Sequence, residues 1–197
     1  MAEIALDRRG LLAEILPNHA EYLIVTGLAG AAKDTAALTQ ESANLITLGG
    51  AMGAAVSMGL GVALGAPDRK VAVVTGDGEL MMNVGALATV ASMMPENLTI
   101  ICIDNGAHGE TGGQPGHTSK RTNLALMAEG AGLPSTFTLT AADQFAEARR
   151  FLAEAPAPRF LWARVLPGPP ADYRRNWDLA ECRLKFRHAY LAGKSGG

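Results

Sequence analysis

Short runs of apolar and β-branched residues recur along the chain, and three of them end at a glycine or at Asp-Asn-Gly. Runs of this length, bounded by turn residues, are typical of buried strands. The pattern predicts five strands, at 22–26, 71–75, 98–103, 136–139 and 160–165.

Helix-length stretches separate these strands, at 51–64, 79–94, 122–130, 141–154 and 177–191. Strands that are apolar throughout and alternate with helices favour a mostly parallel sheet that is covered on both faces. We therefore expect an α/β fold of three layers. Residues 1–197 are expected to form a single domain, in which 167–197 are a C-terminal extension that contains the last helix.

One stretch, 42–67, carries no charged residue and is long enough to cross a bilayer. Its six glycines and its lack of an aromatic belt make it a weak candidate for a membrane span. A helix buried between the sheet and a partner explains the pattern better, so we expect no membrane association.

Composition narrows the class further. With 48% hydrophobic and 18% charged residues, the 197-residue chain is not intrinsically disordered, and its net charge of -2 gives no basic surface for nucleic acid. Cys102 and Cys182 lie far apart without ligand-type neighbours, which argues against a zinc motif and a disulfide scaffold. Because the N-terminus also lacks a signal-peptide pattern, we expect a cytoplasmic protein.

The chain has 23 glycines, and 14 of them fall between 49 and 116. Two glycine-bearing loops there follow predicted strands, at 76–79 (Gly-Asp-Gly-Glu) and 104–109 (Asp-Asn-Gly-Ala-His-Gly). In a parallel sheet such loops meet at the carboxyl ends of the strands, where ligands bind. Glycines let backbone N–H groups approach an anion, and Asp77 and Asn105 offer oxygen ligands that suit Mg²⁺. Taken singly, each loop is also an ordinary turn.

Other phosphate motifs do not fit. The chain has no Walker A pattern, and Gly59-Leu60-Gly61 lies inside a predicted helix instead of directly after a strand. Nicotinamide and nucleoside triphosphate cofactors are therefore disfavoured.

In combination, Gly76-Asp77-Gly78 and Asp104-Asn105 resemble the cofactor motif of thiamine-diphosphate-dependent enzymes. The segment 48–53, leading into 58–65, is similar to the family's segment that packs under the cofactor. Within the family, the runs 76–89 and 104–114 look like the β subunit of sulfopyruvate decarboxylase and the C-terminal half of phosphonopyruvate decarboxylase. The resemblance covers roughly 22–165 and implies a diphosphate-binding (PP) domain.

The resemblance also implies a role for each matching residue. Mg²⁺ on the cofactor diphosphate would be held by Asp77, the amide of Asn105 and the carbonyl of Ala107. Gly50 would present its carbonyl to the aminopyrimidine amine, and Met52 would be the apolar wedge that bends the cofactor. Backbone N–H groups of Gly78 and Glu79 would contact the phosphates, and the remaining cofactor contacts would come from Gly27, Leu28, Gly76, His108 and Gly109.

His108 departs from the family pattern, because related enzymes usually carry Tyr or another residue there. It follows the metal loop, so it is a candidate catalytic residue that protonates an intermediate, although a lone histidine is also commonly structural. Glu79 replaces a more common Ser.

Thiamine enzymes also need a glutamate from a pyrimidine-binding domain, and this chain has no counterpart of that domain. The resemblance therefore implies the diphosphate-binding subunit of a thiamine diphosphate- and Mg²⁺-dependent 2-oxo acid decarboxylase, with a separate pyrimidine-binding (α) subunit that supplies the glutamate. Two alternatives stay open: a subunit that acts on another 2-oxo acid or performs carboligation, and a cofactor-binding module without turnover.

Overall fold

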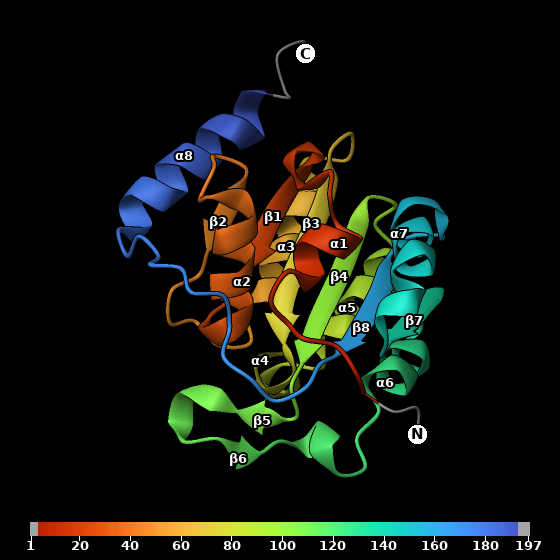
Figure 1. Ribbon diagram of the computed structural model, residues 1–197. Coiled ribbons are helices and arrows are strands. Elements are labelled where there is room, and N and C mark those ends of the chain that lie inside the picture. The colour runs from red at the N-terminus through yellow and green to blue at the C-terminus, as the bar shows by residue number, and fades with distance from the viewer. Residues whose placement is uncertain (1–3, 193–197) are drawn as a thin grey trace.

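The computed structural model describes residues 4–192, which form a six-stranded parallel sheet between two layers of helices (Figure 1). The strand order is β2-β1-β3-β4-β8-β7, and every neighbouring pair is parallel. The strands are β1 Tyr22–Thr26, β2 Leu45–Thr47, β3 Lys70–Gly76, β4 Leu98–Asp104, β7 Ser135–Leu139 and β8 Arg159–Arg164. The predicted three-layer α/β class is confirmed.

Each face of the sheet has its own hydrophobic core. In β1, for example, Leu23 and Val25 enter one core whereas Tyr22 and Ile24 enter the other. Both faces are thus buried, which is why the strands are apolar at successive positions. One face is covered by α3 Ala55–Gly65, α4 Asp77–Met82, α5 Ala86–Met93, α6 Leu124–Ala131 and α8 Leu179–Ala192. The other is covered by α1 Leu11–Ile15, α2 Ala29–Thr39 and α7 Phe145–Glu154.

All five predicted strands are present, but the predicted helices differ in their bounds, and α3 and α7 each begin four residues later than predicted. The helix expected at 51–64 begins only at Ala55, because the preceding loop turns at Gly49 and Gly53, both with positive φ. The helix expected at 79–94 is two helices, α4 and α5, and α4 begins at Asp77. Between them the backbone of Asn83 leaves the helical path, and the Asn83 side-chain amide donates to the Gly53 carbonyl at 3.0 Å.

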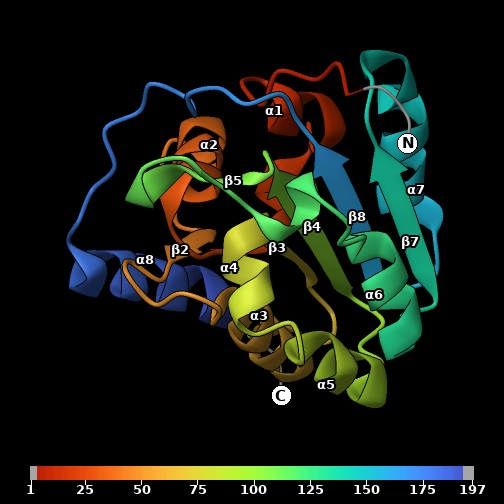
Figure 2. The ribbon, with the colours of Figure 1, turned by 90° about the horizontal axis from the view of Figure 1, so that it is seen from below.

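Several elements escaped the prediction: the 11-residue helix α2, the short α1 and β2, and a small hairpin of β5 Ala107–His108 and β6 Gln114–Pro115. The missed strand β2 has only three residues and pairs with β1 at the edge of the sheet. The hairpin leaves the carboxyl end of β4 and extends across that edge of the sheet (Figures 1 and 2).

The C-terminal segment lies against the rest of the fold. After β8 the connector crosses the carboxyl edge of the sheet, and α8 then packs against β2 and α3 (Figure 1). Tyr190 donates to the Gly65 carbonyl at 2.8 Å, and Arg69 donates to the Ala189 carbonyl at 3.1 Å. Residues 1–3 and 193–197 of the expected domain lie outside the described residues.

The uncharged stretch 42–67 is divided between β2 and α3 and is not one helix. Over residues 4–192, no helix has the length and apolar character needed to cross a membrane.

Candidate cofactor site

Loops that follow β1, β3 and β4 meet at the carboxyl edge of the sheet, as expected for parallel neighbours (Figure 2). They surround a cavity of about 340 Å³. The structure brings ten of the twelve predicted cofactor residues to its lining: Leu28, Met52, Gly76, Asp77, Gly78, Glu79, Asn105, Ala107, His108 and Gly109.

The other two predicted residues, Gly27 and Gly50, are not part of the lining. Gly27 lies directly behind it, because a Cβ there would overlap the carboxylate of Glu79. Gly50 is exposed in the loop before α3, and its carbonyl accepts a hydrogen bond from the Met52 N–H at 3.1 Å.

Asp77 is the first residue of α4 and is buried at the floor of the cavity. Burial raises the pKa of Asp77 to about 7, and the nearby charge of Asp104 adds to the rise. Backbone N–H groups of Asp77 and Gly78 oppose it only in part. A buried carboxylate with this electrostatic imbalance is stabilised by a cation beside it.

Behind Asp77 lies a second buried carboxylate, Asp104, which has three hydrogen-bond donors. Oδ1 accepts from the Gly106 N–H and the Thr118 hydroxyl, each at 2.7 Å, and Oδ2 accepts from Trp162 Nε1 at 2.7 Å. The Thr118 hydroxyl also lies 3.3 Å from Asp77 Oδ2. Asp104 therefore ties the loop after β4 to β8 and to the segment that follows the hairpin.

The metal loop predicted from the sequence is tightly turned. Asn105 Oδ1 accepts from the Ala107 N–H at 3.1 Å, and Gly106 has a positive φ of 67°. Gly116 approaches the same place, since a Cβ there would lie 3.1 Å from Asp77 Oδ2. Asp77, Asn105 and Ala107 thus line one cavity, and carboxylate, amide and carbonyl oxygens are the donors that a hard divalent cation prefers.

Glu79 lies beside Asp77 but is held differently. Its Oε2 accepts from the Thr75 hydroxyl at 3.0 Å, while Oε1 is buried without a hydrogen bond of normal geometry. Burial raises the pKa of Glu79, and backbone N–H groups of Leu28, Gly76 and Gly53 counteract the rise. The Glu79 carboxylate thus packs beneath the cavity between β1 and β3, whereas the sequence analysis gave a role only to the backbone N–H of Glu79.

The side chain of His108 lies over Gly78, in the loop at 76–79 that is predicted to contact the phosphates. A Cβ on Gly78 would be 2.9 Å from His108 Nδ1, so the absence of a side chain at Gly78 lets the imidazole approach. The ring of His117 meets it edge to face, with centroids 6.4 Å apart. The structure therefore places this candidate catalytic residue at the cavity, next to the predicted phosphate contacts.

Part of the cavity wall escaped the sequence analysis because it comes from distant segments. Arg8 and Lys33 line it, and so does the connector at Gly168, Pro169 and Pro170. Arg8 is buried and donates to Asp34 Oδ2 from Nε at 2.9 Å and from Nη2 at 2.7 Å. Asp34 Oδ1 accepts from the Ala171 N–H, so one ion pair joins the N-terminal segment, α2 and the connector. No local motif marks such a long-range contact.

This arrangement defines a class of site: an oxygen-ligand cluster with glycine-rich loops at the carboxyl ends of a parallel sheet, suited to a diphosphate held through a divalent cation. Comparison with known proteins agrees. Residues 29–161 match the family model of the thiamine pyrophosphate enzymes, C-terminal TPP binding domain. The chain therefore belongs to the thiamine diphosphate (thiamine pyrophosphate) enzyme family.

Individual relatives refine the comparison. The chain is 35% identical over 181 residues to the sulfopyruvate decarboxylase subunit beta of Methanocaldococcus jannaschii, covering 91% of this chain and 94% of that protein. It is 36% identical to the phosphonopyruvate decarboxylase of Streptomyces viridochromogenes over 83% of this chain but 39% of that longer protein. The sequence-based resemblance to these two groups is confirmed.

A solved structure shows the same fold. A protein from Mycobacterium smegmatis, assigned as a thiamin diphosphate-dependent enzyme, superposes with a TM-score of 0.65 and 21% identity. The match covers 80% of this chain and 31% of that one.

Proposed function

We propose that the chain is the diphosphate-binding subunit of a thiamine diphosphate- and Mg²⁺-dependent 2-oxo acid decarboxylase, of the sulfopyruvate and phosphonopyruvate type. One observation carries the proposal: Asp77, Asn105 and Ala107 line one cavity in a chain that spans 94% of a sulfopyruvate decarboxylase β subunit. Because the alignment covers nearly the whole length of both chains, the activity of that relative is the best guide to the activity of this one.

In this proposal Asp77, the Asn105 amide and the Ala107 carbonyl hold Mg²⁺. The raised pKa of Asp77 supports the assignment, since a divalent cation offsets the cost of the buried negative charge. Deprotonation of the carboxyl accompanies metal binding.

The other loops hold the cofactor. Backbone N–H groups of Gly78 and Glu79 bind the phosphates, and Gly27 and Leu28 form the wall after β1. The Gly50 carbonyl accepts from the pyrimidine amine, and Met52 supports the bent shape. When bound, thiamine diphosphate supplies the carbanion that adds to a 2-oxo group and accepts the electrons left by carboxylate loss.

His108 is assigned the role of general acid beside the reacting carbon. Its position at the cavity, above Gly78, supports this role. Substitution of a positioned general acid typically reduces rate by about 10²–10⁴-fold. We expect His108→Gln to lower kcat by at least about tenfold while the calorimetric Kd for thiamine diphosphate changes little.

The substrate class in this proposal is an anionic 2-oxo acid. Lys33 and Arg8 line the cavity and supply positive charge at its wall, and Arg8 is already paired with Asp34. Lys33 is therefore the side chain assigned to a second anionic group on the substrate. Lys33→Met should raise KM for sulfopyruvate much more than KM for a neutral aliphatic 2-oxo acid.

A separate α subunit completes the site by supplying the glutamate that contacts the pyrimidine ring. Two large apolar side chains that are exposed near the cavity, Met52 and Met82, support a partner there. Exposed apolar groups of this kind mark protein interfaces. The assembled enzyme is proposed to work in the cytoplasm.

Calorimetry and a reconstituted assay test the proposal. Thiamine diphosphate with Mg²⁺ should bind the purified chain or its complex, and Asp77→Ala should abolish metal-dependent binding, whereas the exposed control Asp143→Asn should not. Carbon dioxide release from sulfopyruvate should require the α subunit. Full turnover by the chain alone would refute the subunit assignment, and cofactor binding without turnover in the complex would favour a non-catalytic module.

A further inference from the structure

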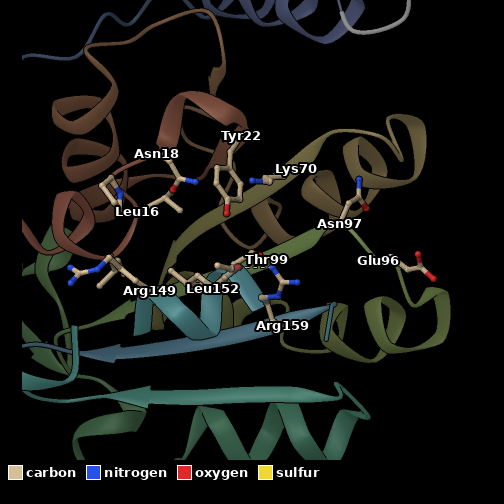
Figure 3. A pocket seen from close by; sticks show the side chains of 13 residues that line it. Leu16, Asn18, Tyr22, Lys70, Glu96, Asn97, Thr99, Arg149, Leu152 and Arg159 are labelled. Atoms are coloured by element: carbon tan, nitrogen blue, oxygen red, sulfur yellow. Dashed lines mark hydrogen bonds between the residues drawn. The ribbon is translucent and has the colours of Figure 1, made fainter. Parts of the chain in front are cut away.

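A second cavity lies at the opposite, amino-terminal edge of the sheet, where β1, β3, β4 and β8 begin (Figure 3). Its volume is about 430 Å³, within the range of small-molecule sites. Each of these strands begins at this cavity and ends at the cofactor cavity. The strands have five to seven residues, so their length separates the two cavities by roughly 17–23 Å. This cavity has no role in the proposed decarboxylase.

The two exposed cations of this cavity are balanced by acids outside its lining. Lys70 Nζ lies 2.6 Å from Glu21 Oε2, and Arg149 Nη1 lies 3.6 Å from Glu14 Oε2. The lining itself contains one carboxylate, Glu96, whose side chain points away from Arg159 (Figure 3). The lining therefore carries three cations and one carboxylate, and two of the cations already have an acidic partner.

Arg159 differs from the other two. Within residues 4–192 no carboxylate forms an ion pair with it. Its Nη1 donates to the Leu152 carbonyl at 2.6 Å, and its Nε is buried without a hydrogen-bond partner. Burial lowers the pKa of Arg159, which reports a cation held in poor solvation. A buried guanidinium donor left unpaired is destabilising unless a ligand satisfies it.

Lys70 and Arg159 converge on one side chain, Tyr22. The Lys70 ammonium lies 5.6 Å from the centre of the Tyr22 ring. Burial raises the pKa of Tyr22, and Lys70 and Arg159 both counteract the rise, so both cations act on the phenol. Two positive charges thus lie near the same phenol, and together they attract an anion to that place.

The rest of the lining is apolar or amide-bearing. Leu16 and Leu152 provide an aliphatic wall beside the Tyr22 ring, and Asn18 and Asn97 lie at the rim (Figure 3). An arginine fork matches the geometry of phosphate and carboxylate groups, and an apolar wall next to it suits a ligand with a hydrocarbon body.

We propose that this cavity is a second ligand site, which binds a small organic anion with its phosphate or carboxylate on Arg159 and Lys70 and its apolar body against Tyr22 and Leu152.

Titration calorimetry on the full chain with three probes tests this: phenyl phosphate, benzoate and inorganic phosphate. We expect saturable one-to-one binding of at least one aromatic anion, at least about tenfold tighter than that of inorganic phosphate. Phenyl phosphate and benzoate distinguish a phosphate from a carboxylate head. The titration is repeated with saturating thiamine diphosphate and Mg²⁺, which should leave the affinity unchanged, so the result does not depend on the proposed function.

Arg159→Met should weaken the probe at least about tenfold, and Arg150→Met, at an exposed arginine of α7 outside the lining, should not. If Arg159→Met does not fold, Lys70→Met at the exposed rim gives the same test and should also weaken binding. No saturable binding by any probe, equal effects of Arg159→Met and Arg150→Met, or displacement by thiamine diphosphate would overturn the proposal.

Discussion

At the scale of single residues, two buried carboxylates at the cofactor edge differ in their hydrogen-bond donors. Asp104 has three donors and its charge is well compensated, whereas Asp77 keeps a pKa of about 7 in a cavity open to ligands. A protein tolerates such an uncompensated group where a ligand completes it. Asp104 thus orders the loop, whereas Asp77 is the carboxylate to which the proposed cation is assigned.

The first prediction concerns pH. The pKa of Asp77 is 3.8 when unperturbed and about 7 in the folded state, so the folded state binds the proton more tightly. The stability linked to this proton is present below pH 4 and is lost as the pH rises to 7. We expect the unfolding free energy of the metal-free chain to fall over this range, and Asp77→Asn to flatten the slope.

Urea denaturation at a series of pH values measures this slope. Thiamine diphosphate with Mg²⁺ should remove the decline in the wild type, because a bound cation favours the ionised carboxylate. An identical pH slope in Asp77→Asn would contradict the assignment.

The second prediction concerns Asp104. An asparagine offers one acceptor oxygen to a place with three donors, from Gly106, Thr118 and Trp162, and its own NH₂ meets donors instead of acceptors. Asp104→Asn should therefore destabilise the chain by about 1–3 kcal/mol and change the near-ultraviolet circular dichroism of Trp162. Asp68→Asn, at an exposed position, is the control and should leave both unchanged.

At the scale of elements, helix α3 shows why its glycines are not equivalent. Gly59 faces β3, and a Cβ there would lie 2.1 Å from Val73 Cγ2, whereas a Cβ at Gly61 meets nothing within 4 Å. The close approach of α3 to the sheet thus depends on one glycine. Gly61 only lowers helix propensity, and the third glycine of the helix, Gly65, gives room to the Tyr190 hydroxyl.

This asymmetry gives a matched pair of substitutions. Gly59→Ala should destabilise by about 1–3 kcal/mol through overpacking, despite the better helix propensity of alanine. Gly61→Ala should stabilise by about 0.5–1 kcal/mol. Thermal and urea unfolding measure both, and equal effects of the two variants would show that α3 does not pack on Val73 as described.

How far the sequence predicts the elements follows from how local their signals are. Apolar runs marked β1, β3, β4, β7 and β8 correctly. The three-residue strand β2 is set by its pairing with β1, and the break between α4 and α5 is set by the contact of Asn83 with Gly53. Tertiary contacts decided these features, and no local pattern reports them.

The candidate site divides in the same way. The loops at 76–79 and 105–109 were found because strand, glycine and polar residue follow one another in the chain. Arg8, Lys33 and the connector at 168–170 reach the cavity only through the fold. The Asp104 network was missed because its donors come from segments 2, 14 and 58 residues away.

At the scale of the whole molecule, the C-terminal segment is built into both the cavity and the core. The connector lines the cavity and donates to Asp34 through Ala171, and Phe186 of α8 enters the core beneath α3. Arg175 of the connector is buried, and its guanidinium lies 4.2 Å from the centre of the Trp177 ring.

Removal of residues 167–197 therefore has two expected effects. The chain should lose several kcal/mol of stability, in line with the loss of a buried aromatic side chain at about 3–5 kcal/mol. Its affinity for thiamine diphosphate should fall because one wall of the cavity is gone. Phe186→Ala with an intact connector separates the two, since it should lower stability and leave the cofactor Kd nearly unchanged, as measured by unfolding and calorimetry.

The two ends of the described chain lie at opposite edges of the sheet. Near its start, Ala5 donates to the Thr140 carbonyl and the Leu6 carbonyl accepts from Leu166, both beyond the carboxyl ends of β7 and β8, whereas the last turns of α8 lie beside Gly65 (Figure 1). A fluorescent protein or affinity tag fused at the N-terminus would thus begin beside the cofactor edge. The last described turn of α8 lies at the other edge, so a label attached there would leave the cofactor cavity open.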